Sequence, residues 1–493
     1  MKLKFLQRIA LLTSLVTTSM VSAQDCQDNW LSTDGNTIVD INGDEVILAG
    51  VNWFGFETNA GHPHGLGWSR SLDGILRQIK DLGFNCLRIP WSNATMFRDK
   101  TLSIGAWLTD PYTGNGPTDN QEVSEAGTPL ELLDLLVEWC QENDMKIILD
   151  NHSREDDAYL VEKLWFTPEL STEQWIEDWV EMAERYKDYS AVIGMDLNNE
   201  PNGTLENAEG ARWGTGDQYD WGIAAKDCGN AILEVNPNVL ILVEGIEAYV
   251  KPDGTETSYW WGGNLQGARD YPITLNTPNK LVYSPHEYGP RVFAQEWFVA
   301  DDFPDNMVGI WEEQFNFLNK SDGYPLLIGE LGIQSAGGLD EIWFEEFIRF
   351  IKDQKLHYTF WAYNPNSGDT GGIVADDWVT PVQWKMDYLL DILSDPIPNC
   401  IARTDSTLSS EEFEAEVVDF KVYPNPTANM IAFSTSSNNI ESVQIYDMNG
   451  REIQATESAD VYEFDLSNVA NGIYLAKVVS EKGVSTTVKV IKN

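Results

Sequence analysis

The stretch VIGMDLNNEP, residues 192–201 of this 493-residue chain, shows a pattern that recurs along the sequence. It opens with an apolar, β-branched run and closes on polar residues that end at Glu200, after which Pro201 stops the strand. Short apolar runs bounded by polar or turn residues are typical of buried strands in parallel sheets. We therefore expect a buried strand whose carboxyl end presents Glu200.

Seven further runs follow the same pattern, and helix-like segments separate them. The eight strand-like runs span residues 46–52, 84–90, 145–151, 192–199, 239–245, 281–288, 325–330 and 356–363. Helical periodicity is clearest at residues 72–83, 129–143, 172–188 and 340–354. Eight strands that alternate with helices over about 350 residues predict an α/β fold, a (β/α)8 or TIM barrel. A hairpin that turns at Asn42-Gly43 precedes the first strand and is expected to cap the barrel floor.

Charged, polar and aromatic residues stand where these strands end. They are Arg88, His152, Asn199, Glu200, His286, Tyr288, Glu330 and Trp361. A charged residue that ends an apolar strand faces a desolvation cost unless it is paired or takes part in chemistry. In a (β/α)8 barrel the active site forms at the carboxyl ends of the strands. We therefore predict that these eight residues form one site.

Glu200 and Glu330 lie at the ends of the fourth and seventh strands, which face each other across a closed barrel of eight. Glycoside hydrolysis needs one protonated and one ionised carboxyl group, about 5 Å apart in a retaining enzyme. The pair therefore predicts glycosidase chemistry. Gly329 and Gly332, on the two sides of Glu330, are expected to let a ligand approach closely.

The two ends of the chain carry different signals. Residues 1–23 combine basic residues, a short apolar stretch and a small-residue cleavage site, as a secretory signal peptide does. Residues 24–400 form the barrel domain, and the acidic residues 401–419 have no apolar periodicity, so we expect a linker. Residues 420–493 hold short β-rich runs, one hairpin of which turns at Asn449-Gly450, and predict a small all-β sandwich. No segment is apolar for long enough to span a membrane.

The formal net charge of −46 belongs almost wholly to residues 24–400, which also hold all 19 Trp. This charge argues against nucleic acid, an anionic membrane or another polyanion as a partner. Tryptophan faces pack well on pyranose C–H groups, so an uncharged glycan suits the domain.

Cys26 and Cys400 flank this block at its two ends, and a disulfide between them would fit export. Cys86 is expected to be a buried free thiol.

Over about residues 36–395 the sequence resembles glycoside hydrolase family five. The resemblance is carried by VNWFGFET at 51–58, LRIPWS at 87–92, ILDNHS at 148–153, GMDLNNEPNG at 194–203, SYWWGGNLQGA at 258–268, YSPHEYG at 283–289, IGELG at 328–332 and FWAYNPNSGDTGGI at 360–373. Three of these motifs resemble the bacterial endo-β-1,4-glucanase branch. The resemblance implies that Glu200 is the general acid/base and Glu330 the nucleophile, with no metal and no cofactor.

The chemistry of such a site suggests roles for the other residues. Asn199 is placed to bind the sugar 2-hydroxyl, and Arg88 and Tyr288 are candidates to hold Glu330 ionised and oriented. The pKa of Glu200 should be raised by the charge of Glu330. Further substrate-binding or supporting residues are His152, His286 and Trp361, and the loop residues Trp53, Trp213, Trp260 and Trp261, which either line sugar subsites or pack the loops.

Residues 420–493 resemble the C-terminal sorting domain of Bacteroidetes type IX secretion cargo. The matching elements are VYPNP at 422–426, VQIYDMNGR at 443–451, LSNVANGIYLAKV at 466–478 and KVIKN at 489–493. The resemblance implies engagement of the type IX machinery, export across the outer membrane and, commonly, removal of the tail. A carbohydrate-binding or spacer module is the alternative, although this tail has no Trp.

The sequence therefore predicts a secreted, monomeric, retaining endo-β-1,4-glucanase that acts on cellulose or related β-glucans. A second hypothesis keeps the site but changes the glycan to mannan, xyloglucan or mixed-linkage glucan, because subsite loops set that choice. A third hypothesis is an inactive sugar-binding surface protein, against which the intact pair Glu200 and Glu330 weighs.

Overall fold

The computed structural model describes residues 26–106, 108–116, 120–206, 209–320, 323–402, 420–435, 440–447, 451–457, 462–480 and 485–493. The signal peptide, nearly all of the expected linker and the Asn449-Gly450 turn lie outside the described residues. The chain divides into two compact units, residues 1–403 and 404–493, and each is described by itself.

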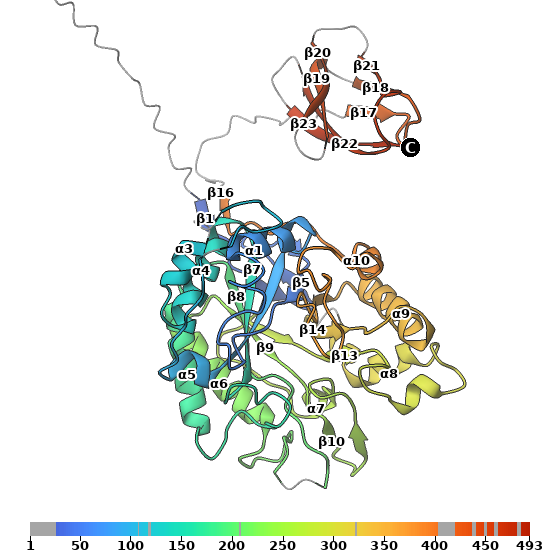
Figure 1. Cartoon of the computed structure of the whole chain (residues 1–493). Coiled ribbons are helices and arrows are strands. Elements are labelled where there is room, and N and C mark those ends of the chain that lie inside the picture. Colours follow the sequence, from blue (N-terminus) through green and yellow to red (C-terminus); the bar gives the residue numbers. More distant parts are fainter. Residues whose placement is uncertain are drawn as a thin grey trace, which may run out of the picture. The chain divides into compact units, whose positions relative to one another are not determined.

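A parallel sheet of nine strands forms the centre of the first unit (Figure 1). Its strands are β5 (Ala49–Asn52), β6 (Cys86–Ser92), β7 (Lys146–Ser153), β8 (Val192–Asp196), β9 (Leu240–Val243), β12 (Leu281–Tyr283), β13 (His286–Tyr288), β14 (Leu327–Gly332) and β15 (His357–Phe360). The order in the sheet is β12-β9-β8-β7-β6-β5-β15-β14-β13. All eight predicted strands are present, and the prediction of an α/β barrel is confirmed.

The sixth predicted strand, residues 281–288, is divided into two pieces. β12 pairs with β9 and β13 pairs with β14, and only Ser284 and Pro285 separate the two pieces in the chain. Proline has no N–H to continue a ladder, which explains the break. A parallel bridge between Tyr283 and Leu326 joins β12 to the approach of β14, so the sheet closes on itself as a barrel.

The helices lie outside the curled sheet (Figure 1). They are α1 (Leu72–Asp81), α2 (Asn93–Phe97), α3 (Gln121–Glu125), α4 (Pro129–Glu142), α5 (Thr172–Arg185), α6 (Trp221–Val235), α7 (Gln266–Asp270), α8 (Met307–Gln314), α9 (Gly338–Gln354) and α10 (Gln383–Leu389), with the 3-10 turns η2 (Glu296–Val299) and η3 (Asn316–Leu318). Local signals define their starts: at α4, Thr128 and Glu131 form a capping box. Among the described residues, no helix combines the length and the apolarity that a membrane span requires.

Short strands close the floor of the barrel. β2 (Ser32–Asp34), β3 (Thr37–Val39) and β4 (Glu45–Val46) form an antiparallel sheet that contains the predicted hairpin. Ile38 of β3 belongs to a fully apolar layer, here called the floor cluster, which crosses the barrel interior. Its buried members are Leu31, Ile38, Leu48, Cys86, Ile148, Ile193, Leu240, Leu242, Val282, Leu327 and Ile397. The hairpin therefore caps the floor as predicted.

A disulfide joins the two ends of the barrel unit. β1 (Cys26–Asp28) pairs with β16 (Cys400–Ala402), and Cys26 and Cys400 are bonded with their Cα atoms 5.6 Å apart. Cys86 is a buried free thiol, as expected. A separate antiparallel pair, β10 (Ala248–Val250) and β11 (Glu256–Ser258), extends a loop after the fifth barrel strand.

The second unit consists of two antiparallel sheets. One contains β17 (Phe420–Tyr423), β18 (Met430–Thr435) and β21 (Tyr462–Asp465), and the other β19 (Ile440–Asp447), β20 (Glu452–Glu457), β22 (Gly472–Ser480) and β23 (Ser485–Lys492). Phe433 and Phe464 of the first sheet share one apolar core with Val443, Val478 and Val490 of the second. The predicted β-sandwich is therefore confirmed.

Candidate active site

Arg88 lies at the centre of the site, at the carboxyl end of the barrel, and is fully buried. Four buried carboxylates surround its guanidinium, and together they form what we call the Arg88 cluster. They are Asp150 at 3.2 Å, Asp196 at 2.9 Å, Glu244 at 3.1 Å and Glu330 at 2.8 Å. One planar cation thus orients side chains from four other parts of the barrel, which its fixed fork of donors suits.

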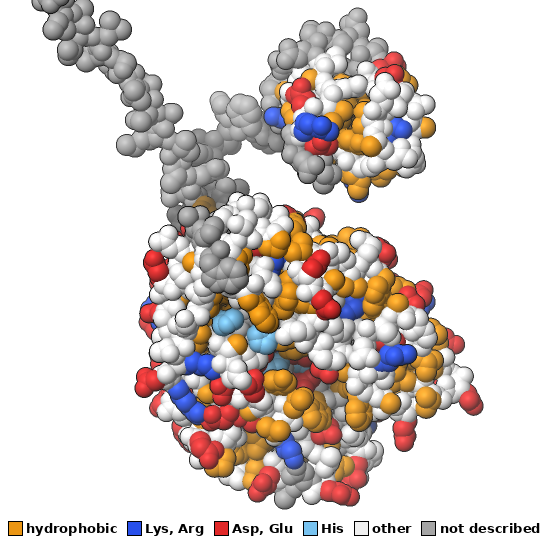
Figure 2. Space-filling view, in the orientation of Figure 1, with side chains coloured by type: hydrophobic (Ala, Val, Ile, Leu, Met, Phe, Trp, Pro, Cys, Tyr) orange, Lys and Arg blue, Asp and Glu red, His pale blue; other side chains and the backbone are white. Residues whose placement is uncertain are grey.

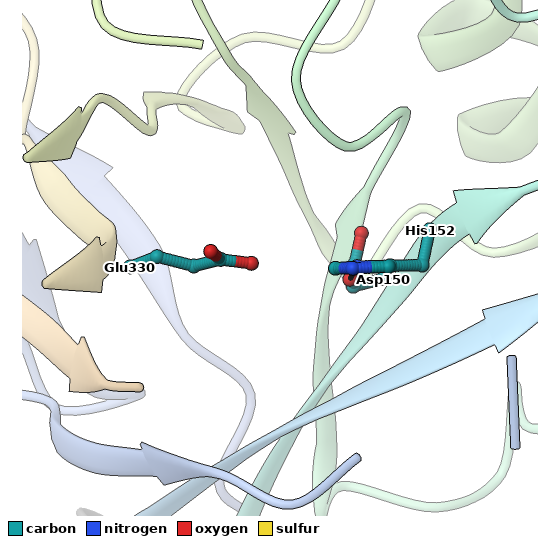
Figure 3. Close-up of side chains that lie close together, drawn as sticks. All are labelled: Asp150, His152 and Glu330. Atoms are coloured by element: carbon teal, nitrogen blue, oxygen red, sulfur yellow. Dashed lines mark hydrogen bonds and ion pairs between the residues drawn. The ribbon is translucent and has the colours of Figure 1, made fainter. Parts of the chain in front are cut away.

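Glu330 reaches the site through an irregularity in its strand. The register of β14 on β15 shifts between Ile328 and Leu331, and such bulges re-aim side chains. Glu330 extends toward Asp150 and His152 on β7 (Figure 3). Its Oε1 accepts a hydrogen bond from Arg88 Nη1 at 2.8 Å, and the Tyr288 hydroxyl donates to its Oε2.

The surroundings of Glu330 favour its ionised form. Burial by itself would raise the pKa of Glu330, but the nearby His286, Arg88 and His152, together with the Tyr288 hydrogen bond, lower it below its ordinary value. Glu330 is therefore held as a carboxylate that is ready to act as a nucleophile or base.

Glu200 follows β8 and has the opposite character. Its backbone φ is +48°, and its Oε1 lies 3.0 Å from His286 Nδ1. Burial raises the pKa of Glu200 to about 7, helped by the charge of Glu330 and opposed by the hydrogen bond with His286. Its side chain is still 19% exposed, so it can meet a substrate. Glu200 is therefore suited to donate a proton near neutral pH.

The two carboxyl groups lie close to each other. One oxygen of Glu200 and one oxygen of Glu330 are within 4.8 Å, and His286 Nδ1 lies 3.6 Å from Glu330 and 3.0 Å from Glu200. This upper limit is compatible with the carboxyl pair of retaining glycosidases, whose groups are roughly 5 Å apart. The barrel thus brings together two groups that stand 130 positions apart in the numbering and that have pKa values shifted in opposite directions.

An aromatic wall lies beside the two glutamates. Trp361 is partly exposed, and its ring is nearly parallel to those of His152 and Phe54, with centroids 5.5 and 5.4 Å away. Asp150 Oδ2 lies 2.6 Å from His152 Nδ1; burial alone would lower the pKa of His152, but the Asp150 charge raises it. Histidines gather in the middle of the face that Figure 2 shows, with carboxylates beside them.

Asn199 completes the set of eight residues. Its Oδ1 accepts a hydrogen bond from Arg88 Nη2 at 3.1 Å, which fixes the orientation of the amide. The structure therefore brings all eight residues from the strand ends into one connected site.

Comparison with known proteins identifies the family. Residues 39–367 match the family described as cellulase (glycosyl hydrolase family 5). The chain belongs to glycosyl hydrolase family 5. Residues 421–493 match the secretion system C-terminal sorting domain, so this glycoside hydrolase carries a sorting tail of that family.

Relatives of this family 5 hydrolase cover most of the barrel unit. An endoglucanase of Paenibacillus polymyxa is 41% identical over 364 residues, which cover 73% of this chain and 86% of the relative. The major extracellular endoglucanase of Xanthomonas campestris pv. campestris is 37% identical over 381 residues, which cover 76% of this chain and 74% of the relative.

Solved structures resemble the same part of the family 5 chain. The catalytic domain of the Xanthomonas campestris enzyme superposes with a TM-score of 0.65 at 36% identity and covers 74% of this chain and 99% of that domain. A complex of an endocellulase from Pyrococcus horikoshii with cellotetraose gives a TM-score of 0.66 at 36% identity, with the same two coverages.

Two of the four loop tryptophans of this hydrolase lie inside the protein instead of on an open cleft. Trp53 is 0% and Trp213 is 3% exposed, and their indole N–H groups donate to the carbonyls of His64 and Tyr271. A stacking platform needs an exposed ring face. Their alternative role, loop packing, is therefore the one that the structure supports. Trp260 is nearly buried at 7%, and Trp261 is half-buried.

The glycines near Glu330 also serve packing. A Cβ atom at Gly329 would come within 2.5 Å of Ser284 Oγ and 2.9 Å of His286 Nε2, and one at Gly332 within 2.4 Å of Thr370. The expectation that they make room for a ligand is therefore wrong for both positions. They make room for neighbouring side chains of the enzyme itself.

Three groups of side chains in this site have ligand atoms close enough for a metal ion. They are Asp150 with His152 and Glu330; Glu200 with His286 and Glu330; and Asp150 with Asp196 and Glu244. Arg88 lies within 3.2 Å of Asp150, Asp196, Glu244 and Glu330. The guanidinium is thus the cation that these carboxylates surround in the structure.

Three carboxylates of the Arg88 cluster were not predicted from the sequence. Asp150 lies in the last half of β7, Asp196 is the last residue of β8, and Glu244 directly follows the apolar run LILV of β9. Each of them shows the same signal that singled out Glu200, a carboxylate at the end of a buried strand, and could have been found by it.

Proposed function

We propose that this family 5 hydrolase is an endo-β-1,4-glucanase that cleaves internal bonds of cellulose or related β-glucans with retention of anomeric configuration. The observation that carries the proposal is the close pair formed by Glu200 and Glu330, with oxygens within 4.8 Å and pKa values shifted apart. A protonated acid beside an ionised nucleophile is what double displacement requires.

In the first step, the Glu330 carboxylate attacks the anomeric carbon while Glu200 transfers its proton to the departing glycosidic oxygen. The bond to the leaving sugar breaks, and an ester forms between the glycosyl unit and Glu330. Arg88 and Tyr288, which contact both oxygens of Glu330, orient the nucleophile for this attack.

In the second step, Glu200 takes a proton from an incoming water, and the resulting attack on the anomeric carbon releases Glu330. Esterification removes the negative charge of Glu330, which is one of the causes of the raised pKa of Glu200. The pKa of Glu200 therefore falls between the two steps, and its role changes from acid to base.

Substrate choice rests on stacking and hydrogen bonding. Trp361 offers a partly exposed indole for a pyranose ring, and Asn199 is held by Arg88 where it can meet a 2-hydroxyl. The acidic chain, with a net charge of −46, suits an uncharged polymer. Relatives described as endoglucanases, and the cellotetraose complex of a similar endocellulase, support a β-1,4-glucan.

A panel of purified polysaccharides tests the proposal. Soluble β-1,4-glucan should be cut into oligosaccharides faster than mannan, xyloglucan and mixed-linkage glucan, and proton NMR should detect the β-anomer first. Initial release of the α-anomer would exclude retention. A higher rate on mannan would change the substrate and keep the mechanism. No new reducing ends on any glycan would support a binding protein.

We further propose that the chain is exported by the type IX machinery, with residues 1–23 as the signal peptide and the sorting tail as the export signal. The match of residues 421–493 to the sorting-domain family supports this role. The test is expression of full-length and tail-deleted chains in a host with type IX secretion. The full chain should reach the medium or cell surface, whereas the tail-deleted chain should accumulate in the periplasm.

A further inference from the structure

Glu244 links the acid side of the site to the nucleophile side. It directly follows β9 and is fully buried. Its Oε2 accepts a hydrogen bond from the backbone N–H of Glu200 at 2.7 Å. Its Oε1 accepts one from Arg88 Nη2 at 3.1 Å and lies 3.2 Å from His286 Nε2. One side chain thus contacts three residues of the site.

The contact with the Glu200 backbone matters because that backbone is strained. Glu200 has a φ of +48°, in the left-handed region, and it precedes Pro201. A residue with a side chain stays in this region only where surrounding contacts hold it there. The hydrogen bond to Glu244, together with one from Asn202 to the Glu200 carbonyl at 2.9 Å, provides such contacts.

A second connection runs through the imidazole of His286. One ring nitrogen faces Glu244, and the other lies 3.0 Å from the Glu200 carboxyl. A carboxyl group behind a histidine fixes the orientation of the ring and thereby the group on its other side. Glu244 therefore binds the Glu200 backbone directly and lies beside the ring whose other nitrogen contacts the Glu200 carboxyl.

The loop after β11 approaches the Glu244 carboxyl closely at Gly262. A Cβ atom at Gly262 would come within 2.4 Å of Glu244 Oε2, and the same glycine has a φ of +70°. The charged groups facing Glu244 are Asp150, Asp196 and Arg88 from β6 to β8, and His286 from β13. Oε2 can accept the Glu200 N–H whether or not the carboxyl is ionised.

We propose that Glu244 is a positioning residue, which holds the Glu200 backbone and the His286 ring so that the Glu200 carboxyl reaches the glycosidic oxygen. The inference rests on the proposed role of Glu200 as acid/base. A misplacement of a catalytic group by about 1 Å can cost roughly 100-fold in rate. Loss of Glu244 should therefore weaken proton donation far more than nucleophilic attack.

The test compares two substrates in the full-length E244Q enzyme. A soluble β-1,4-glucan has a sugar leaving group that needs a proton, whereas 2,4-dinitrophenyl β-cellobioside has a leaving group that departs without one. Glutamine keeps the size of the side chain, but its NH2 group must face a donor, either the Glu200 N–H or Arg88. We expect kcat/KM to fall about 100-fold on the glucan and less than about fivefold on the dinitrophenyl substrate.

Two comparison variants make the result decisive. E200A sets the reference for loss of the acid. Glu287 is also fully buried, beside His286 in sequence, and it accepts a hydrogen bond from the Tyr259 hydroxyl at 2.6 Å. E287Q is the matched control, and it should keep the wild-type ratio of the two kcat/KM values. If the melting curve shows that E244Q is unfolded, E244D replaces it. Its side chain is one methylene shorter, and it should show the same selective loss of kcat/KM on the glucan.

The possible failures are distinguishable. If E200A loses both activities equally, the proposed acid/base role of Glu200 is wrong. If E200A shows the selective loss and E244Q loses both activities equally or neither, the positioning role of Glu244 is overturned and the proposed function stands.

Discussion

On β7, Ile148 faces the barrel interior in the floor cluster, whereas Asp150 and His152 face it two and four residues further on, in the candidate active site. β9 repeats the contrast, with Leu242 in the floor cluster and Glu244 directly after the strand. Because side chains alternate with a period of two, one strand lines the interior at both levels.

The two levels differ in what holds them together. The floor cluster contains apolar side chains and one free thiol, which gain stability from burial. The Arg88 cluster contains one guanidinium and four carboxylates, whose desolvation is offset only by their mutual contacts. Burial of apolar side chains thus stabilises the floor of the barrel, whereas ion pairs hold the charged groups in place at the opposite end.

The largest effect is expected from Glu330→Gln. Loss of the proposed nucleophile should lower kcat/KM on soluble β-1,4-glucan by about 10⁴-fold, because no glycosyl ester can form. The fold should be kept, because Arg88 retains three carboxylate partners. Reducing-end release measures the activity. Glu313→Gln, at a side chain that is 55% exposed, is the control. Retention of a tenth of the activity would contradict the assignment of Glu330.

A substitution in the floor cluster should lower stability and leave activity nearly unchanged. Leu242→Ala removes a side chain that is 1% exposed and should lower the free energy of unfolding by about 3 kcal/mol. It should leave kcat/KM within about twofold of wild type, since the floor holds no substrate. Denaturant unfolding and glucan hydrolysis measure the two quantities. A large loss of activity in a folded variant would erase the distinction between the two levels.

The pH profile of kcat/KM should separate the pKa of Glu200 from that of Glu330. Glu200 must be protonated to act as the acid, and its pKa is raised to about 7, so kcat/KM should fall about tenfold per pH unit above that value. Glu330 must be ionised, and its lowered pKa places the acid limb below the ordinary range of a glutamate. Rates from pH 3 to pH 9 give both limbs. In Glu200→Ala the alkaline limb should disappear, and its persistence there would assign it to another group.

The smallest effect is expected on KM, which should change in a variant of Trp361 but not in a variant of Trp53. Trp361→Phe should raise KM for the glucan about fivefold, because a smaller ring packs less well on the sugar. Trp53→Phe, at a fully buried ring, should lower the melting temperature and leave KM unchanged. Initial-rate kinetics and thermal unfolding measure the pair. An equal rise of KM in both variants would place Trp53 in the substrate cleft after all.

Strong local patterns made most of the fold predictable. The apolar runs gave all eight barrel strands, and the helices α1, α4, α5 and α9 lie within or close to the expected segments. The break of the sixth strand at Ser284-Pro285 was missed, although proline is a local signal for it. The eight residues at the strand ends were predictable because parallel strands of a barrel must bring their carboxyl ends together.

Other features depend on contacts that no local pattern carries. Trp53 and Trp213 could not be distinguished from exposed tryptophans, because burial of a loop residue depends on which loops pack over it. Gly329 and Gly332 were assigned to ligand access, whereas their neighbours Ser284 and Thr370 come from other elements. The role of Glu244 likewise required three contacts from three distant parts of the chain.

The barrel, the tail and the two candidate glutamates were predictable from the sequence, because strand length, helical periodicity and the polarity of strand ends are properties of neighbouring residues. The surroundings of the two glutamates, by contrast, were visible only in the folded chain. The register of β14 on β15 shifts next to Glu330, which contacts Arg88. Glu244 binds the Glu200 backbone, and His286 contacts the Glu200 carboxyl. The physical reason is that a pKa and a distance depend on the groups around a side chain in space, which closure of the barrel assembles.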